Sequence, residues 1–316
     1  MTELIHQLSL SAPLFLLVLA GYLLARFAGW PSGVSEALSR FVFSAAMPAM
    51  LFHLMSNFSR LPAVDPGLLI AFFGSCLIVF GLGRLLAWKL FRLDGVSQSV
   101  FALGGVFSNN VMLGLPLARL LLGEAALPAV ALVLVFNALI LWTLVTVSVE
   151  WARHGQFSLQ GFVRTARGVL SNPLIVAILS GTLCGLLFQH QRLALPAFID
   201  VTLGMVADTA APMALIALGM GLAQYSVRAG LAQAGVISLL KLVVQPLVVW
   251  MLAHLLGLPP LETRVVVLLG SIAVGVNVYM MATRFGVMEG QIAGALVLST
   301  LLSALSTPVL LALIAA

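Results

Sequence analysis

The chain has 316 residues, of which 62% are hydrophobic and only 8% are charged. An ordinary soluble domain has about 25% charged residues, so this composition excludes a soluble enzyme, a disordered chain and a small disulfide scaffold. The net charge of +5 comes from 15 Lys and Arg spread along the chain, whereas a nucleic-acid-binding protein needs its basic residues clustered on a wet face. We expect a membrane protein whose partner is the lipid bilayer and not a nucleic acid.

A helix needs about 20 consecutive apolar residues to cross the hydrocarbon core of a bilayer. The sequence holds ten such segments, separated by breaks rich in proline, glycine and charge. We interpret the first segment as a retained helix, because no basic residue precedes it as in a signal peptide. The fold class predicted is all-α, with ten transmembrane helices. They cover residues 8–28, 35–57, 67–90, 97–122, 126–150, 169–189, 197–223, 231–256, 262–284 and 290–314.

Basic residues in the loops between these segments predict the orientation, because short cytoplasmic loops are enriched in Lys and Arg. With the N-terminus outside, the inner loops hold ten basic residues and the outer loops four. We therefore predict a multi-pass protein of the inner (plasma) membrane with both termini on the extracytoplasmic side. The inner ten are Arg26, Arg40, Arg84, Lys89, Arg92, Arg153, Arg164, Arg167, Arg228 and Arg284; the outer four are Arg60, Arg119, Arg192 and Arg264.

The two halves of the sequence resemble each other. Residues 11–23 and 171–183 share Ser, Pro, Leu, Leu, Gly and Leu at matching places, with an offset of 160. An internal proline recurs in the second and seventh segments, and an asparagine in the fourth and ninth. These pairs are Pro48 with Pro212 and Asn110 with Asn277.

Because each half would contain five helices, an odd number, the second half would enter the membrane upside down. Inverted repeats of this kind are typical of secondary transporters. We predict a first repeat over residues 1–155, a central cytoplasmic loop over 156–168 and a second repeat over 169–316.

The fourth and ninth segments contain residues that weaken a helix in mid-membrane. Glycines, asparagines and one proline lie between Gly104 and Pro116. The stretch from Gly270 to Tyr279 also contains glycines and an asparagine. Unwound backbone is tolerated there only against protein or a cavity, and half-helix N-termini attract anions. A kinked packing helix with asparagine bonded to its neighbours explains one such segment equally well, but two at matching positions favour a substrate site. The candidate substrate-binding residues are Asn109, Asn110, Pro116, Asn137, Asn277 and Tyr279; Asn137 could equally bond a neighbouring helix.

Several short motifs recur here in the order of a known family. They are Ser108-Asn109-Asn110 through Gly114-Leu115-Pro116, Phe41 through Met47-Pro48-Ala49 to Phe52, Asn172-Pro173-Leu174, Asp208 through Pro212 to Leu215, Gly219, and Lys241 with Pro246. With these motifs the whole chain resembles the auxin efflux carrier family of membrane transporters. No long hydrophilic central segment is present, so it resembles the compact bacterial type.

The resemblance implies a fold related to bile-acid symporters and sodium/proton antiporters. Helices 1, 2, 6 and 7 would form a scaffold, and helices 3, 4, 5, 8, 9 and 10 a moving transport unit in which broken helices 4 and 9 cross. The resemblance also implies small carboxylates, such as malonate or malate, as substrates. One departure concerns the ninth segment, whose expected break contains no proline, only Gly275 and Asn277.

Three further polar residues are candidates for charge or coupling roles. Lys241 lies about 16 Å into the eighth segment at 1.5 Å per residue, too deep for easy snorkelling, and Gln245 follows one turn later. In related symporters sodium fills the negative potential of freed carbonyls, and we predict that the Lys241 ammonium takes that place. Asp208 is the third candidate; the alternative interpretation is a charge at the outer end of the helix or a partner for the backbone near Pro212.

We therefore predict a sodium-independent secondary transporter that moves a small organic anion by alternating access. The alternative is a sodium-coupled symporter of the bile-acid type. Such a symporter would need carboxylate ligands for sodium, and the middles of the fourth and ninth segments contain no Asp or Glu. An intramembrane protease would show His-Glu-x-x-His or paired aspartates, and neither is present, so we expect no enzyme, metal or cofactor. The sequence leaves open the substrate, the direction of transport, the coupling ion and the oligomeric state; a homodimer is compatible with it.

Overall fold

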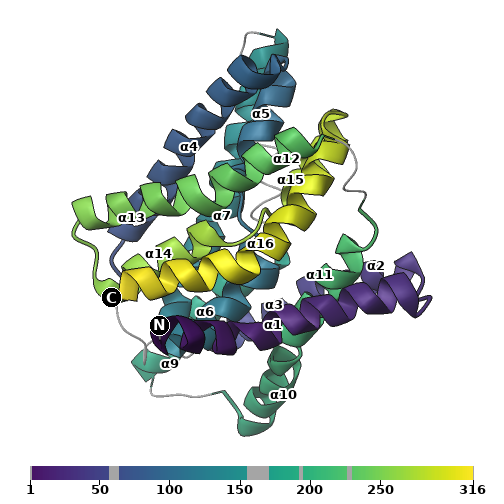
Figure 1. Cartoon of the computed structure of the whole chain (residues 1–316). Coiled ribbons are helices and arrows are strands. Elements are labelled where there is room, and N and C mark those ends of the chain that lie inside the picture. Colours follow the sequence, from purple (N-terminus) through teal and green to yellow (C-terminus); the bar gives the residue numbers. More distant parts are fainter. Residues whose placement is uncertain (1, 57–63, 155–170, 192–194, 226–229, 316) are drawn as a thin grey trace.

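The computed structural model describes residues 2–56, 64–154, 171–191, 195–225 and 230–315 (Figure 1). Within these ranges the chain is helical apart from short connections and one isolated β-bridge. The uninterrupted long helices are α1 (Thr2–Phe27), α4 (Gly67–Phe91), α7 (Leu127–His154), α9 (Pro173–Gln191) and α16 (Glu289–Ala315). The shorter helices are α2 (Ser32–Phe41), α3 (Met47–Ser56), α5 (Gly95–Gly104), α6 (Leu115–Leu122), α10 (Ala197–Asp208), α11 (Ala210–Leu222), α12 (Leu231–Leu239), α13 (Gln245–Leu255), α14 (Pro260–Ser271) and α15 (Val276–Phe285).

Among the described residues, seven helical segments are long and apolar enough to cross a membrane. The all-helical class is thus confirmed, whereas the count of ten spans is not. The predicted fourth and ninth segments are each divided into two shorter helices, and the predicted sixth has an apolar helical stretch of only Pro173–Leu187. The seven segments are Gln7–Phe27, Gly33–Ser56, Gly67–Phe91, Glu124–Arg153, Ala197–Leu222, Leu231–Leu255 and Glu289–Ile314.

The surface of the helical assembly is apolar where a soluble protein would be charged. Large side chains such as Leu16, Leu77, Leu183 and Leu301 are more than half exposed. Exposed apolar surface of this extent marks an interface with a membrane or another protein. Together with the seven helical segments that are long and apolar enough to cross a membrane, this surface indicates a multi-pass membrane protein.

The helices pack as two sets. In one set α1 lies against α11 and α3 lies against α9; in the other α4 contacts α5 and α13, and α14 contacts α13 and α16. Helices α1 and α16 also pack together, and the beginning of α1 and the end of α16 lie on the same side of the molecule (Figure 1).

Glycines allow the closest helix contacts of the first set. A Cβ on Gly219 of α11 would collide with the carbonyl oxygen of Val18 in α1, and one on Gly21 would collide with that of Ile216. In the same way a Cβ on Gly181 of α9 would lie 2.7 Å from the carbonyl oxygen of Phe52 in α3. Small residues at such contacts are what lets transmembrane helices approach closely.

Three helices widen by a π-turn just before a proline. Each π-turn ends two residues before the proline, which lacks an N–H and would clash with the carbonyl four residues earlier in a regular α-helix. The wider turn relieves that clash. The turns are Val42–Ala46 before Pro48, Asn110–Gly114 before Pro116, and Leu240–Val244 before Pro246.

The hairpin between α4 and α5 begins α5 with a side-chain cap. The Asp94 carboxylate accepts hydrogen bonds from the backbone N–H groups of Val96 at 2.9 Å and Ser97 at 3.1 Å. The Ser97 hydroxyl donates a further bond of 2.6 Å. This hydroxyl contributes most to holding the pKa of the Asp94 carboxyl below its ordinary value.

Candidate substrate site at the crossing of two broken helices

The two helix breaks meet in the interior of the protein. Residues 105–109, before the π-turn that leads into α6, and residues 272–275, between α14 and α15, leave the helical conformation. Asn109 N–H donates to the carbonyl of Ala273 at 2.9 Å, and Gly275 N–H donates to that of Phe107 at 2.8 Å. Ser108 and Val274 thereby face each other in an antiparallel bridge. Backbone groups freed by one break are thus satisfied by the other, as burial requires.

The second break forms without a proline. Ile272 and Gly275 both have extended backbone angles, with ψ values of 166° and 143°. A Cβ on Gly275 would lie 3.0 Å from the carbonyl oxygen of Ser108, so the close approach of the two backbones favours glycine here. The ninth segment is therefore broken at Gly275, although it contains no proline there.

Helix α16 supplies hydroxyl groups to the second break. The Val274 N–H donates to Ser299 Oγ at 3.0 Å. The Thr307 hydroxyl donates to the carbonyl oxygen of Ser271 at 3.0 Å. Both hydroxyls are fully buried, and each satisfies a backbone group that the interrupted helix leaves without its usual partner.

Hydrogen bonds of Lys241 and Gln245 connect the two breaks. Lys241 lies in the π-turn before α13, and Gln245 is the first residue of α13. The fully buried Lys241 ammonium donates to the carbonyl oxygen of Gly270 and to Gln245 Oε1, the latter at 2.8 Å. The Gln245 amide nitrogen then donates to the carbonyl oxygen of Val106 at 3.2 Å, and it lies 3.3 Å from the Cys76 sulfur. One end of this chain of bonds is in the last turn of α14 and the other is in the first break.

Three asparagines near the first break have side-chain atoms without a hydrogen-bond partner among the described residues. Asn109, Asn110 and Asn137 are only 6%, 2% and 5% exposed. Both polar atoms of the Asn110 side chain are unpartnered, as are Nδ2 of Asn109 and Oδ1 of Asn137. Buried amides without partners are costly in a protein interior, and at a binding site a ligand or water can supply the missing bonds.

A cavity of about 620 Å³ reaches this region. Its walls come from α2, α9, the first break, α7 and α15. Two predicted site residues, Asn137 and Asn277, line it, whereas Asn109, Asn110, Pro116 and Tyr279 are not among its lining residues. The lining consists of Arg40, Phe43, Ser44, Phe107, Val111, Leu134, Asn137, Trp142, Asn172, Pro173, Leu174, Ile175, Ile178, Asn277, Met280 and Arg284.

Tyr279 and Asp208 are not among the residues that line the cavity. The Tyr279 ring packs on that of Tyr225, with centroids 4.7 Å apart; burial, with a smaller contribution from Tyr279, raises the pKa of Tyr225 to about 12. The Asp208 side chain is 76% exposed, and its carboxylate lies 3.9 Å from the Arg119 guanidinium. Asp208 is the last residue of α10, at the junction with α11 inside the apolar segment Ala197–Leu222.

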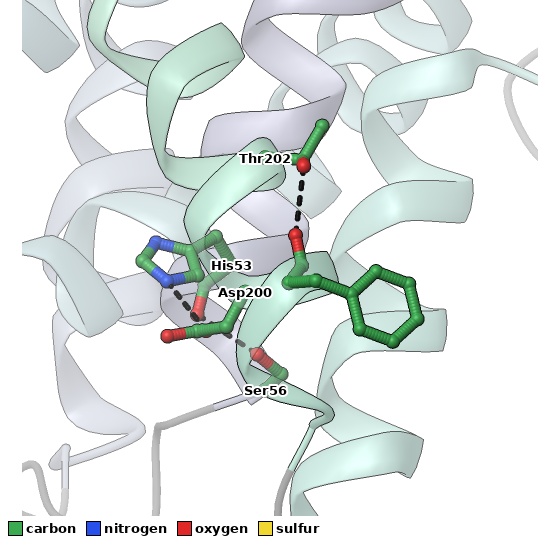
Figure 2. Close-up of polar contacts among 5 residues, drawn as sticks. His53, Ser56, Asp200 and Thr202 are labelled. Atoms are coloured by element: carbon green, nitrogen blue, oxygen red, sulfur yellow. Dashed lines mark hydrogen bonds and ion pairs between the residues drawn. The ribbon is translucent and has the colours of Figure 1, made fainter.

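A half-buried pair connects α3 and α10. His53 Nε2 of α3 lies 2.9 Å from a carboxylate oxygen of Asp200 in α10, and Figure 2 shows the two side chains pointing toward each other. Nearby, the hydroxyls of Ser56 and Thr202 bond carbonyls of their own helices, those of His53 and Phe198. These contacts secure helix ends and lie outside the lining of the cavity.

Arginine side chains at the cavity were missed as site residues. Arg40 and Arg284 both line it, although from the sequence we interpreted them only as basic residues of the loops. The sequence predicts that both arginines lie near helix ends. It does not predict that they line the same cavity. No group of three or more His, Cys, Asp or Glu side chains that could hold a metal ion occurs in the described part of the chain.

Comparison with known proteins identifies the family. A family model described as "Membrane transport protein" matches residues 8–160 and 163–311. The chain belongs to this family of membrane transporters. The resemblance to the auxin efflux carriers, drawn from the motifs around Asn110 and Pro48, is thereby confirmed.

Two relatives of this membrane transport protein align over nearly their whole length. One, named "Putative malonate transporter", comes from Rhizobium meliloti strain 1021; it is 29% identical over 305 residues, which are 96% of this chain and 94% of the relative. The other is an uncharacterized transporter of Methanocaldococcus jannaschii, 25% identical over 302 residues, with 92% and 93% covered. Both relatives are named as transporters and not as enzymes.

Proposed function

We propose that this chain is a secondary transporter that moves a small organic anion, a carboxylate, across the cytoplasmic membrane by alternating access and without sodium. The observation that carries the proposal is the cavity lined by Phe107 of the first break and by Asn277, two residues after the second break, together with buried amides that lack partners. Such crossings are typical substrate sites of transporters with inverted repeats. The relative named as a malonate transporter supports a carboxylate substrate.

We further propose that the chain crosses the membrane ten times as two inverted repeats. The close glycine contacts support this architecture. Gly21 lies against the carbonyl of Ile216, and Gly181 lies against that of Phe52. Gly21 and Gly181 differ by the offset of 160 found in the sequence, and Phe52 and Ile216 by the offset of 164 that separates the two repeated prolines. Each half would therefore make the same contact with the other half.

The two packed sets of helices support a division into a scaffold and a moving unit. The contacts of α1 with α11 and of α3 with α9 join the proposed helices 1, 2, 6 and 7. The cavity lies between parts of both sets, with α2 and α9 on one side and α7 and α15 on the other. Relative movement of the two sets would open the cavity to one side of the membrane and then to the other. With both termini outside, the arginines at the cavity would face the cytoplasm in this conformation.

Independence from sodium is supported by the surroundings of Lys241. Its ammonium already donates to the carbonyl of Gly270 beside the second break and, through Gln245, is connected to the first. A fixed cation that satisfies these groups leaves no role there for a bound sodium ion. It also makes the crossing electropositive, which favours an anionic substrate.

Uptake into proteoliposomes tests the proposed function. Purified protein should accumulate or exchange labelled malonate, and replacing sodium by choline should leave the rate unchanged. Empty liposomes and protein bearing Asn137→Ala serve as controls. Strict dependence on a sodium gradient would favour the bile-acid-type symporter instead, and an absence of uptake for every small carboxylate in a broad screen would refute the anion proposal.

A further inference from the structure

Two arginines from different sets of helices line the same cavity. Arg40 comes from the end of α2, and Arg284 comes from the last turn of α15. Both side chains are exposed, which places them at the open end of the cavity, whereas Asn137 and Phe107 are buried. The cavity thus has two cationic groups at its mouth and amide groups further inside.

Neither arginine forms an ion pair with any residue that the structure describes. The guanidinium of Arg284 lies 5.9 Å from the ring centroid of Phe285. The carbonyl oxygen of Arg40, and not its side chain, accepts the hydrogen bond from Ser44. The lining of the cavity contains no aspartate or glutamate among the described residues. The positive charge is therefore not neutralised by the walls of the cavity.

This arrangement matches the chemistry of a dianion. A guanidinium group binds a carboxylate through two parallel hydrogen bonds, which gives both energy and geometric specificity. A monocarboxylate brings one negative charge to two guanidinium groups, whereas a dicarboxylate offers one carboxylate to each. We propose that Arg40 and Arg284 select a dicarboxylate over its monoanionic analogues; this inference rests on the function proposed above.

The positions of the two arginines add a consequence for the transport cycle. Arg40 belongs to a helix that packs with α11, and Arg284 to one that packs with α16 and α5. A dicarboxylate held by both would connect the two sets of helices across the cavity. A ligand with one carboxylate brings only one negative charge to the two guanidinium groups, so the second charge contributes to selectivity as well as to affinity.

Binding measurements on purified protein test the inference directly and do not depend on transport. The probes are straight-chain dicarboxylates from malonate upward, each paired with its monoamide, which has the same skeleton but one negative charge. We expect at least one dicarboxylate to bind tenfold or more tightly than its monoamide, a difference of about 1.4 kcal/mol. Arg40→Gln and Arg284→Gln should each weaken dicarboxylate binding by about tenfold, with little effect on the monoamide. Arg40→Lys and Arg284→Lys, which keep the charge, should retain part of the preference.

Arg92→Gln is the matched control, because Arg92 is exposed at the end of α4 and outside the lining of this cavity. Thermal unfolding of every variant verifies that the protein is folded. The inference is overturned if no dicarboxylate binds better than its monoamide, or if Arg92→Gln weakens binding as much as the cavity variants. Dicarboxylate binding without any uptake into proteoliposomes would instead contradict the proposed transport function and leave the dianion site standing.

Discussion

The Lys241 ammonium donates a hydrogen bond to the carbonyl oxygen of Gly270, one residue before the end of the helix that is interrupted at the crossing. This contact connects a charge in α13's π-turn to backbone that the second break has freed. It explains how a lysine can remain fully buried in a segment that is otherwise apolar. It also makes Lys241 the first residue to test.

Replacing Lys241 by Gln should reduce carboxylate uptake by at least tenfold, because the crossing loses its fixed cation. The carbonyl of Gly270 would lose its donor, and an unpaired buried acceptor costs about 1–3 kcal/mol of stability. Lys241→Arg should restore uptake only in part, since the planar guanidinium does not replace a compact ammonium. Lys89→Gln, an exposed lysine in α4, is the control. Normal uptake by Lys241→Gln would contradict this role.

Asn110→Ala should abolish uptake while changing the free energy of unfolding by less than about 1 kcal/mol. Both polar atoms of the Asn110 side chain lack partners among the described residues, and polar contacts in membranes average only about 0.6 kcal/mol. Gln245→Leu provides the contrast, because the Gln245 amide bonds Lys241 and Val106. That variant should be clearly less stable. Chemical denaturation in detergent and uptake assays measure the two effects, and an active Asn110→Ala protein would remove Asn110 from the site.

Ser299→Ala should destabilise the second helix break. The Val274 N–H would lose the acceptor that α16 provides, at a cost of about 1–3 kcal/mol for a buried unpaired donor. Ser303→Ala is the matched control, because the Ser303 hydroxyl is equally buried but bonds only the Thr300 carbonyl of its own helix. Hydrogen exchange at residues 272–275 should rise in Ser299→Ala only. Equal exchange in both variants would show that the hydroxyl is not needed.

Gly219→Ala should destabilise the packing of α1 on α11 by about 1–3 kcal/mol, the usual cost of overpacking. The added Cβ would meet the Val18 backbone, which cannot rotate away as a side chain could. Gly235→Ala in α12 is the control, since nothing lies within 4 Å of its Cβ position and alanine favours a helix by up to about 1 kcal/mol over glycine. Thermal unfolding midpoints should therefore move in opposite directions. A stable Gly219→Ala protein would contradict the close approach.

The proposed orientation predicts that a C-terminal reporter active only in the cytoplasm is silent. The prediction follows from the ten-to-four distribution of basic loop residues and from an even number of spans. The same reporter fused after Arg92, in a predicted inner loop, should be active and serves as the positive control. Strong activity at the C-terminus would refute both the orientation and the even count.

Local sequence patterns were enough to predict the apolar segments, the two weakened stretches and the importance of Lys241. Long apolar runs can be recognised as membrane helices without the tertiary structure, because the backbone hydrogen bonds of such a helix are formed within the helix itself. The weakened stretches around Asn110 and Asn277 were equally visible, since glycine and proline act on the backbone where they occur. Lys241 stood out because a charge so far from both ends of an apolar segment requires a partner nearby. The recurrence of proline and glycine at offsets of 160 and 164 predicted an inverted repeat, whereas the grouping of helices into a scaffold and a transport unit came from the resemblance to the family.

Only the tertiary structure decided which side chains share the cavity. Arg40 and Arg284 are 244 positions apart, and their convergence depends on how the two sets of helices pack, which no local pattern encodes. The same holds for Ser299, whose partner Val274 lies in the second break, between α14 and α15, and for Asp208, which points to the surface beside Arg119. Composition sets which segments enter the membrane, but the face that each helix turns toward its neighbours is determined by packing between segments distant in sequence. That packing placed Asn277 on the cavity and left Asn110 outside its lining.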